Sequence, residues 1–171
     1  DIGLVVDNHR VTTQKTRIIS GNQHLLRVDE EMDIFLNKRI QEQFLELISS
    51  LLESGGIDAI IMQDYDKGVL TPRVISEVIS ASERVAVPVL VDPKGHDFSR
   101  YRGATLITPN RSELALAMRM DGGDPDALSL AASRLCRELG LERLVLTLGE
   151  LGMSVVDAGA QTRIPAAARE V

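Results

Sequence analysis

The chain has 171 residues, of which 44% are hydrophobic and 26% charged, a composition typical of one globular domain. The net charge of −6, the aromatic content of 3% and the lack of Trp argue against a surface for nucleic acid or for an anionic membrane. No apolar run is long enough to predict a membrane-spanning helix. The single cysteine, Cys136, excludes an intrachain disulfide; we expect a buried thiol in a reducing cytoplasm.

The first predicted element is a β-hairpin over residues 12–29, because Ser20-Gly21-Asn22 is a turn signal between two runs of β type. Every second residue of its second strand, from Gln23 through Arg27 to Asp29, lies on one face. This face is unusually polar for a core strand. It is therefore either a solvated surface or a lid that faces a ligand.

Helices and strands then alternate. Residues 33–53 predict a helix that ends at Gly55-Gly56, because apolar residues recur on one face. The apolar run at 59–62 suits a buried parallel strand, and Thr71-Pro72 opens the next helix as its N-cap and first residue. Further strands are predicted at 89–91, 106–108, 144–146 and 154–156, and further helices at 110–120 and from Asp124-Pro125 to Gly140.

This alternation predicts an α/β fold in which a mostly parallel sheet is covered by helices on both faces. The last two strands lie too close in sequence for a crossover helix, so we expect them to pair antiparallel. In open sheets of this kind, ligands bind beyond the carboxyl ends of the strands. The residues that follow each buried strand are therefore the first candidates for function.

Four strand ends carry polar residues and glycines. They are 63–68, 92–95, 108–113 and 147–152. Each has a purely structural interpretation: Asp92-Pro93-Lys94-Gly95 fits a type I turn, Asn110-x-x-Glu113 fits a helix capping box, the glycines of 147–152 fit a hairpin turn, and Lys67 fits a solvated loop. Their convergence at one edge of the sheet favours a shared function.

The functional interpretation is a site for nucleotide phosphates. Asn110 and Glu113 lie in a first helical turn, beside the positive end of the helix dipole, and can organise Mg²⁺ through its retained waters. The glycines of 147–152 let backbone N–H groups approach phosphate oxygens, and Lys94 and Lys67 supply compact positive charge. The sequence contains no histidine pair with metal-ligand spacing, no serine-hydrolase motif and no Walker-type lysine loop.

These stretches resemble the ribokinase-type carbohydrate kinase family. Asn110-x-x-Glu113 is similar to the family's Asn-x-x-Glu motif, and Thr147-x-Gly149-x-x-Gly152 is similar to its nucleotide-side glycine turn. Within the family the chain most resembles the heptose 7-phosphate kinases of ADP-heptose synthesis, through residues 10–17, 22–29, 64–68 and, above all, 92–113. Val11 and His24 depart from the usual lid sequence, which has proline and glutamine there.

The resemblance implies a ribokinase-like fold with a small β lid hairpin, incomplete at both ends. Residues 1–171 would form one partial sugar-kinase domain, with lid strands in 1–30 and an α/β nucleotide-binding part in 31–171. The family's Gly-rich sugar-binding region would precede Asp1, and its Gly-Ala-Gly-Asp motif, with the catalytic base, would follow Val171. We therefore expect no catalytic base in this chain, and no kinase activity from this segment alone.

The implied reaction transfers the γ-phosphoryl group of ATP to the anomeric hydroxyl of a heptose 7-phosphate, with Mg²⁺, for lipopolysaccharide core precursor synthesis. The implied nucleotide-binding residues are Lys94, Asn110, Arg111, Ser112, Glu113, Thr147, Gly149 and Gly152; Asn110 and Glu113 would also hold Mg²⁺ through water. The sugar-side candidates are Gln23, Arg27, Asp64 and Lys67. The lid strands would join two copies into a homodimer. The alternatives are another ribokinase-type sugar kinase and a non-catalytic nucleotide-binding module.

Overall fold

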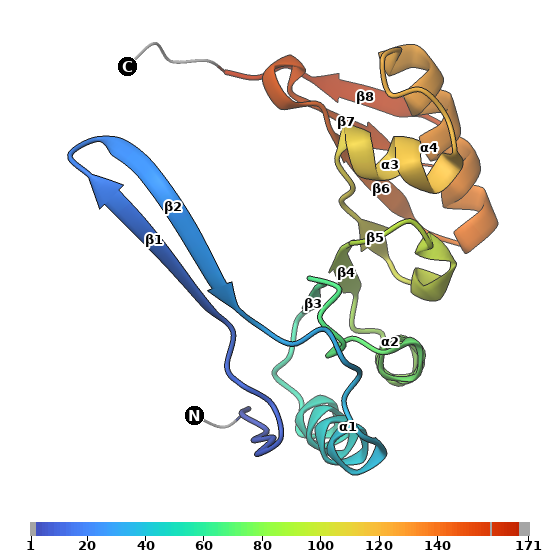
Figure 1. Cartoon of the computed structure of the whole chain (residues 1–171). Helices are drawn as coiled ribbons and strands as arrows, with labels where there is room; N and C mark the ends of the chain where they lie inside the picture. Colours follow the sequence, from blue (N-terminus) through green and yellow to red (C-terminus); the bar gives the residue numbers. More distant parts are fainter. Residues whose placement is uncertain (1–2, 158, 168–171) are drawn as a thin grey trace.

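The computed structural model describes residues 3–157 and 159–167, which form a six-stranded sheet with helices packed on it and a separate two-stranded hairpin (Figure 1). The hairpin consists of β1 (Gln14–Ser20) and β2 (Gln23–Glu30). The remaining elements are α1 (Lys38–Glu53), β3 (Ile60–Gln63), α2 (Pro72–Arg84), β4 (Val89–Asp92), the 3₁₀ helix η1 (Phe98–Tyr101), β5 (Leu106–Ile107), α3 (Arg111–Met118), α4 (Pro125–Leu139), β6 (Arg143–Thr147), the 3₁₀ helix η2 (Gly149–Leu151), β7 (Met153–Val156) and β8 (Gln161–Ile164).

The strands of the large sheet lie in chain order, β3-β4-β5-β6-β7-β8. The first four are parallel, with Ile60 opposite Val89 and Leu90 opposite Leu106. The β6–β7 and β7–β8 pairs are antiparallel, as the short connection after β6 predicted. The mostly parallel sheet is thus confirmed, and β8 is an addition that the sequence patterns did not reveal.

Helices cover one face of this sheet. Val91 and Leu146 point to that face and are fully buried, whereas Ile61, on the other face, is 75% exposed. Figure 1 shows α2, α3 and α4 on the same side of the strands. Right-handed crossovers between strands that are neighbours in the sheet place every connecting helix on one face. The sequence predicted helices on both faces of the sheet. The helices of the described residues lie on this one.

Local signals fix most helix ends. Thr71 caps α2 by accepting a hydrogen bond from the N–H of Val74, and Gly140 ends α4 with a left-handed backbone, both as predicted. The predicted start of α1 at residue 33 was wrong. Asn37 caps α1, and the N–H of Leu36 donates to the carbonyl of Gly68 at 2.9 Å, which holds the preceding segment extended.

The core lies between the sheet and the helices. Its largest fully buried side chain is Tyr101, from η1, which lies among apolar residues of the helices and strands. Cys136 is buried there as predicted, and burial raises the pKa of its thiol. Within residues 3–157 and 159–167, no helix is both long and apolar enough to cross a membrane.

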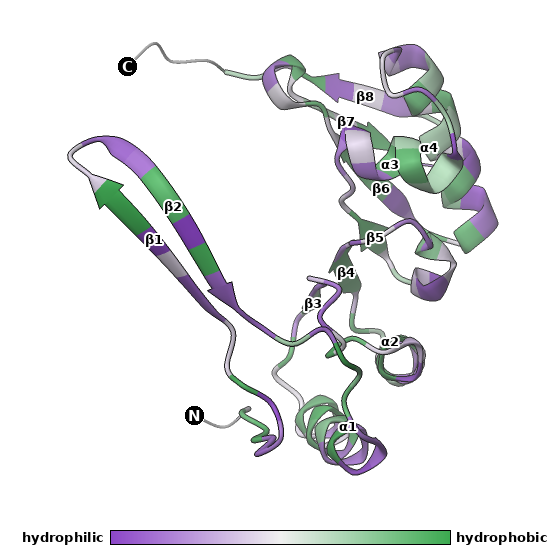
Figure 2. Cartoon of the chain, in the orientation of Figure 1, coloured by the Kyte–Doolittle hydropathy of each residue, from purple (hydrophilic) through white to green (hydrophobic). Residues whose placement is uncertain are grey.

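The hairpin stands away from the sheet, on the side opposite the helices (Figure 1). Its strands pair antiparallel, with an irregularity between Ile18 and Ile19, and β2 ends at Glu30. Figure 2 shows apolar and polar segments along both strands. Leu26 and Val28 are among its apolar residues that are about half exposed. A two-stranded hairpin with exposed apolar residues is marginally stable unless something packs on it.

Candidate functional site

The strand ends singled out by sequence meet at one edge of the sheet, as predicted. Gln63 at the end of β3 lies opposite Asp92 at the end of β4. Asn110, after β5, forms an isolated parallel bridge with Thr147 at the end of β6, and the N–H of Thr147 donates to the carbonyl of Pro109 at 3.0 Å. The loops after β5 and β6 are therefore joined by their backbones.

Asn110 and Glu113 form the capping box that their spacing predicted. The Asn110 side chain accepts from the N–H of Glu113 at 2.9 Å, and the Glu113 carboxylate accepts from the N–H of Asn110 at 3.0 Å. The cap fixes both side chains at the positive end of α3. A group of negative charge can be stabilised there, in addition to the carboxylate that already occupies the first turn.

Lys94 lies against the same carboxylate. Its ammonium donates to Oε1 of Glu113 at 2.8 Å, while the other oxygen accepts from Asn110. This contact raises the pKa of Lys94, mainly through the hydrogen bond that Lys94 donates to Glu113 and then through the charge of that carboxylate. The Lys94 side chain is 52% exposed, so its charge remains accessible to a phosphate. The chain thus places one cation and one carboxylate side by side at the mouth of the site.

The turn after β6 is built by two glycines with different roles. Gly149 has φ of 63°, and a Cβ there would meet nothing within 4 Å. Gly152 has φ of 88°, and a Cβ there would lie 2.1 Å from the carbonyl oxygen of Ile164 in β8. Glycine is therefore required at Gly152 for close packing of the turn against β8, whereas at Gly149 the surroundings are open.

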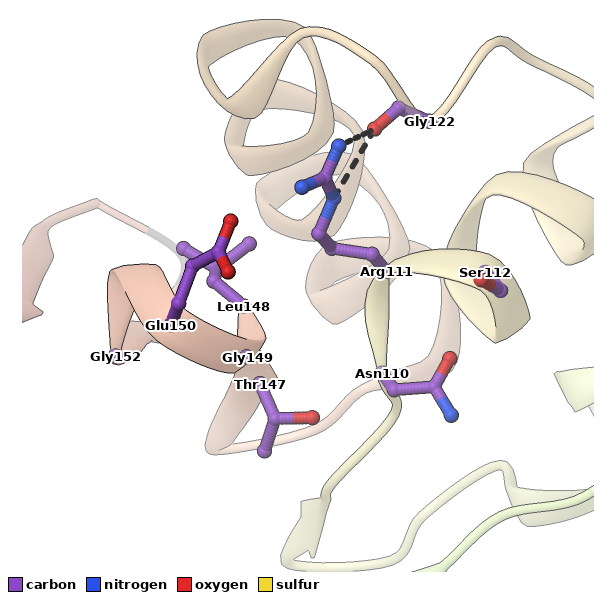
Figure 3. Close-up of a pocket in the computed structure, with 9 residues that line it drawn as sticks. All are labelled: Asn110, Arg111, Ser112, Gly122, Thr147, Leu148, Gly149, Glu150 and Gly152. Carbon is purple, nitrogen blue, oxygen red and sulfur yellow. Dashed lines mark hydrogen bonds between the residues drawn. The ribbon is translucent and has the colours of Figure 1, made fainter. Parts of the chain in front are cut away.

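A hollow of about 760 Å³ lies between the start of α3 and the turn after β6 (Figure 3). The Thr147 hydroxyl points toward Asn110 at its base. Arg111 extends along its wall and donates to the carbonyl of Gly122 at 2.7 Å and 3.2 Å, so its guanidinium fastens the loop after α3. Of the predicted nucleotide-binding residues, all but Lys94 and Glu113 line this hollow: they are Asn110, Arg111, Ser112, Thr147, Gly149 and Gly152.

Three further residues line this hollow that the sequence motifs did not single out: Gly122, Leu148 and Glu150. Gly122-Gly123 was a visible turn signal, but its place next to α3 depends on how the chain folds back after the helix. Glu150 faces Arg111 across the hollow in Figure 3.

A second hollow of about 540 Å³ lies on the uncovered face of the sheet. Its lining includes Ile61, Asp92 and Glu113, and it shares Asn110 and Thr147 with the first hollow. Two open spaces therefore meet at one wall. The Lys94–Glu113 pair lies at the edge of that wall.

Two of the four predicted sugar-side residues are engaged in internal contacts at the ends of β2 and β3. Asp64 is only 6% exposed, and its carboxylate is turned into the protein toward Arg100 and Tyr101. Lys67 pairs with Glu31 at 2.6 Å, at the base of the hairpin, and this hydrogen bond raises the pKa of Lys67. The structure thus does not present the Asp64 carboxylate to a ligand.

The other two sugar-side residues lie on the hairpin. Arg27 donates two hydrogen bonds to the Asp29 carboxylate, at 2.8 Å and 2.9 Å, in a bidentate ion pair. Gln23 is exposed beside the turn. Figure 1 shows the hairpin apart from β5 and β6, after which the site loops begin. The structure does not bring Gln23 and Arg27 to the two hollows.

Comparison with known proteins identifies the family. A model described as the pfkB family carbohydrate kinase matches residues 3–171. The bifunctional protein HldE of Pelobacter propionicus is 43% identical over 169 residues, or 98% of this chain and 34% of that protein. The protein of the same name from Koribacter versatilis is 45% identical over 161 residues, or 94% of this chain and 32% of that protein. The chain thus spans about a third of the length of these curated relatives.

Solved structures show the same fold. Escherichia coli phosphofructokinase-2 in complex with potassium matches with a TM-score of 0.68 and 20% identity, over 85% of this chain and 47% of that one. Arabidopsis thaliana ribokinase complexed with ribose and ATP matches with a TM-score of 0.64 and 17% identity, over 94% of this chain and 50% of that one. The ribokinase-like fold expected from the motifs is confirmed, and the chain belongs to the pfkB family of carbohydrate kinases.

Proposed function

We propose that this chain is the nucleotide-binding part of a kinase that transfers the γ-phosphoryl group of ATP to the anomeric hydroxyl of a heptose 7-phosphate. The product would supply ADP-heptose for lipopolysaccharide core synthesis. The family match supports a carbohydrate kinase. The resemblance of residues 92–113 to heptose 7-phosphate kinases, together with 43% identity to a bifunctional HldE protein, supports the heptose as acceptor.

The observation that carries the proposal is the pair of hollows with a shared wall. Phosphoryl transfer requires two substrates that approach one another in line across a short gap. A nucleotide in the hollow at Gly149 and an acceptor in the hollow at Asp92 would meet at Asn110 and Thr147. Glu113 lines the second hollow beside this wall and Lys94 is bonded to it, which supports a role for both in contact with the transferred group.

The donor set at this wall fits a hydrated Mg²⁺. Glu113 offers a carboxylate and Asn110 an amide oxygen, both hard oxygen donors, and Mg²⁺ takes few protein ligands while keeping several waters. In the described part of the chain, no group of three or more His, Cys, Asp or Glu residues could hold a metal alone. Phosphate and water oxygens would therefore complete the coordination. When bound, the metal would neutralise part of the phosphate charge.

The chain's own residues would bind and orient the nucleotide. The Lys94 ammonium would meet a phosphate oxygen, and the Thr147 hydroxyl would donate to another. The open turn at Gly149 would let backbone N–H groups approach the phosphates. Glu113 would hold its water-mediated contact to the metal while its other oxygen stays fixed by the helix cap. These contacts supply positioning and charge stabilisation, which are the main means of catalysis in phosphoryl transfer.

We further propose that the hairpin joins two copies in a homodimer. Three apolar residues that share one face of the hairpin by their register, Ile18, Leu26 and Val28, are 45% to 53% exposed. A second hairpin packed on this surface would bury them. Gln23, Arg27 and Lys67 stay candidates for contact with the sugar in such a closed form, in which the hairpin would lie over the acceptor.

The experiment uses the full-length protein that contains this chain. It is incubated with Mg-ATP and heptose 7-phosphate, and the bisphosphate product is measured. Turnover with this acceptor and not with fructose 6-phosphate or ribose supports the proposal. Turnover only with another sugar would indicate a different kinase of the family. Nucleotide binding without turnover on any sugar would indicate a non-catalytic module.

A further inference from the structure

A buried polar cluster lies beneath the loop that carries Lys94. It consists of Asp64, Arg100 and Tyr101, which come from the end of β3 and from η1. Asp64 is 6% exposed, Tyr101 is fully buried, and the Arg100 side chain is 16% exposed. None of the three lines either hollow. They therefore cannot act by touching a nucleotide or an acceptor bound there.

The Asp64 carboxylate is fully engaged within the cluster. Arg100 Nη2 donates to its Oδ2 at 2.5 Å, and the Tyr101 hydroxyl donates to the same oxygen at 2.7 Å. The other oxygen accepts from the N–H of Asp66 at 2.8 Å. The loop after β3 and the 3₁₀ helix η1 are thereby tied together.

The cluster also holds the backbone of Lys94 on both sides. The N–H of Lys94 donates to the Tyr101 hydroxyl at 3.3 Å. The carbonyl of Lys94 accepts from Arg100 Nη2 at 3.1 Å. The side chain of the same residue extends the other way, to Glu113. A residue whose ammonium faces the site thus has both its backbone donor and its backbone acceptor fixed by Arg100 and Tyr101.

Stability alone does not account for this arrangement. Replacing a buried ion pair with apolar side chains of similar volume is often neutral or stabilising. Arg100 Nε is buried and has no hydrogen-bond partner in the part of the chain that the structure describes, which costs further free energy. A fully packed apolar cluster could fill the space under the loop, but it could not bond to the Lys94 backbone.

We propose that Asp64, Arg100 and Tyr101 are positioning residues that fix Lys94 so that its ammonium meets the nucleotide phosphates beside Glu113. Asp64 orients Arg100 and Tyr101, and these two orient Lys94. This inference rests on the proposed function, because it assigns Lys94 to the nucleotide. It replaces the expectation that Asp64 contacts the sugar.

The test is a double-mutant cycle on the full-length protein. Arg100→Met is made alone and in a Lys94→Met background, and affinity is measured for a fluorescent ATP analogue (mant-ATP) with Mg²⁺. Alone, Arg100→Met should weaken binding about tenfold, as for the loss of a hydrogen bond to a charged group. In the Lys94→Met background the further loss should be less than about twofold, because coupled residues are not additive. An equal loss in both backgrounds would overturn the proposal.

Three further measurements keep the test specific. Arg102→Met is the matched control, because Arg102 follows η1 and donates to the carbonyl of Glu138 at 2.7 Å, away from the cluster; it should bind the analogue like the wild type. Tyr101→Phe keeps the buried ring and removes the hydroxyl's contacts with Asp64, Arg100 and the Lys94 backbone, so it should act in the same direction even if Arg100→Met folds poorly. KM for ATP should rise while KM for the acceptor stays unchanged; a rise confined to the acceptor would overturn the positioning role.

Binding by the wild-type protein distinguishes a failure of the proposed function from a failure of the positioning role. If the unmodified protein does not bind the analogue at all, the proposed function fails. If it binds, and the Arg100 and Tyr101 variants bind equally well, the proposed function stands and the positioning role fails.

Discussion

Gly152→Ala should destabilise the protein far more than Gly149→Ala, although both glycines line the same hollow and both have positive φ. Positive φ disfavours a residue with a Cβ at both positions, by about 1–2 kcal/mol in the left-handed helical region. Gly152, with φ of 88° and ψ of −130°, lies outside that region in a conformation that is nearly exclusive to glycine. Only at Gly152 does the new Cβ collide with backbone, at 2.1 Å from the oxygen of Ile164 and 2.6 Å from the nitrogen of Ala166. Relieving such an overlap costs about a further 1–3 kcal/mol, because β8 must move away from the turn.

The two variants should also differ in what they lose. Gly149→Ala places a methyl group where nothing lies within 4 Å, at the mouth of the proposed phosphate site. It should therefore lower nucleotide affinity, whereas its loss of stability should be limited to the cost of the left-handed backbone. Urea unfolding measures the first effect as a shift in midpoint without a change in slope, and titration with mant-ATP measures the second. Equal destabilisation by both variants would refute the assignment of Gly152 to packing against β8.

Three other substitutions test separate parts of the molecule. Glu113→Gln keeps a side chain that can cap α3, so stability should be spared, but kcat/KM should fall about 10–100-fold and the Mg²⁺ concentration required should rise, as for loss of a group that orients a metal. Unchanged Mg²⁺ dependence would mean that Glu113 is a helix cap only. Arg10→Met removes donors to the carbonyls of residues 32, 34 and 67, so amide hydrogen exchange should rise at the base of the hairpin, whereas Arg17→Met on β1 should not have this effect. Leu26→Lys should lower the molecular mass measured by light scattering toward that of a monomer, whereas Leu130→Lys, on the exposed side of α4, should not. A wholly monomeric wild type would refute the dimer proposal.

The elements that could be predicted from sequence are those fixed by adjacent residues. Thr71-Pro72 and Asp124-Pro125 start helices, and Gly140 ends one, through hydrogen bonds and backbone angles within a few residues. The start of α1 was misplaced because Leu36, although apolar and in phase with the helix, is held extended by its bond to Gly68. A contact across more than 30 residues leaves no local pattern.

The residues of the candidate site differ in the same respect: some could be predicted from a local motif and others depend on distant contacts. Asn110 and Glu113 form a motif of four residues, so the side chains that meet at the start of α3 were readable in advance. Asp64 was also a candidate by sequence, as an acidic residue after a strand. Its exposure, however, depends on Arg100 and Tyr101, which lie 36 and 37 residues away. Whether a carboxylate faces solvent or an internal arginine is decided by tertiary packing, which residue type alone does not specify.

The arrangement of the sheet explains why nucleotide and acceptor should respond to different substitutions. Because β3 to β6 lie in chain order, their connecting helices share one face, and the opposite face, with Ile61, is open. The second hollow lies on that open face, and the hairpin stands on the same side of the sheet (Figure 1). An acceptor bound there could not be enclosed by α2, α3 or α4, and of the described elements the hairpin is the one placed to cover it. Changes on the hairpin should therefore alter KM for the acceptor, whereas changes at Arg111 or Ser112, which line the first hollow and not the second, should alter nucleotide binding.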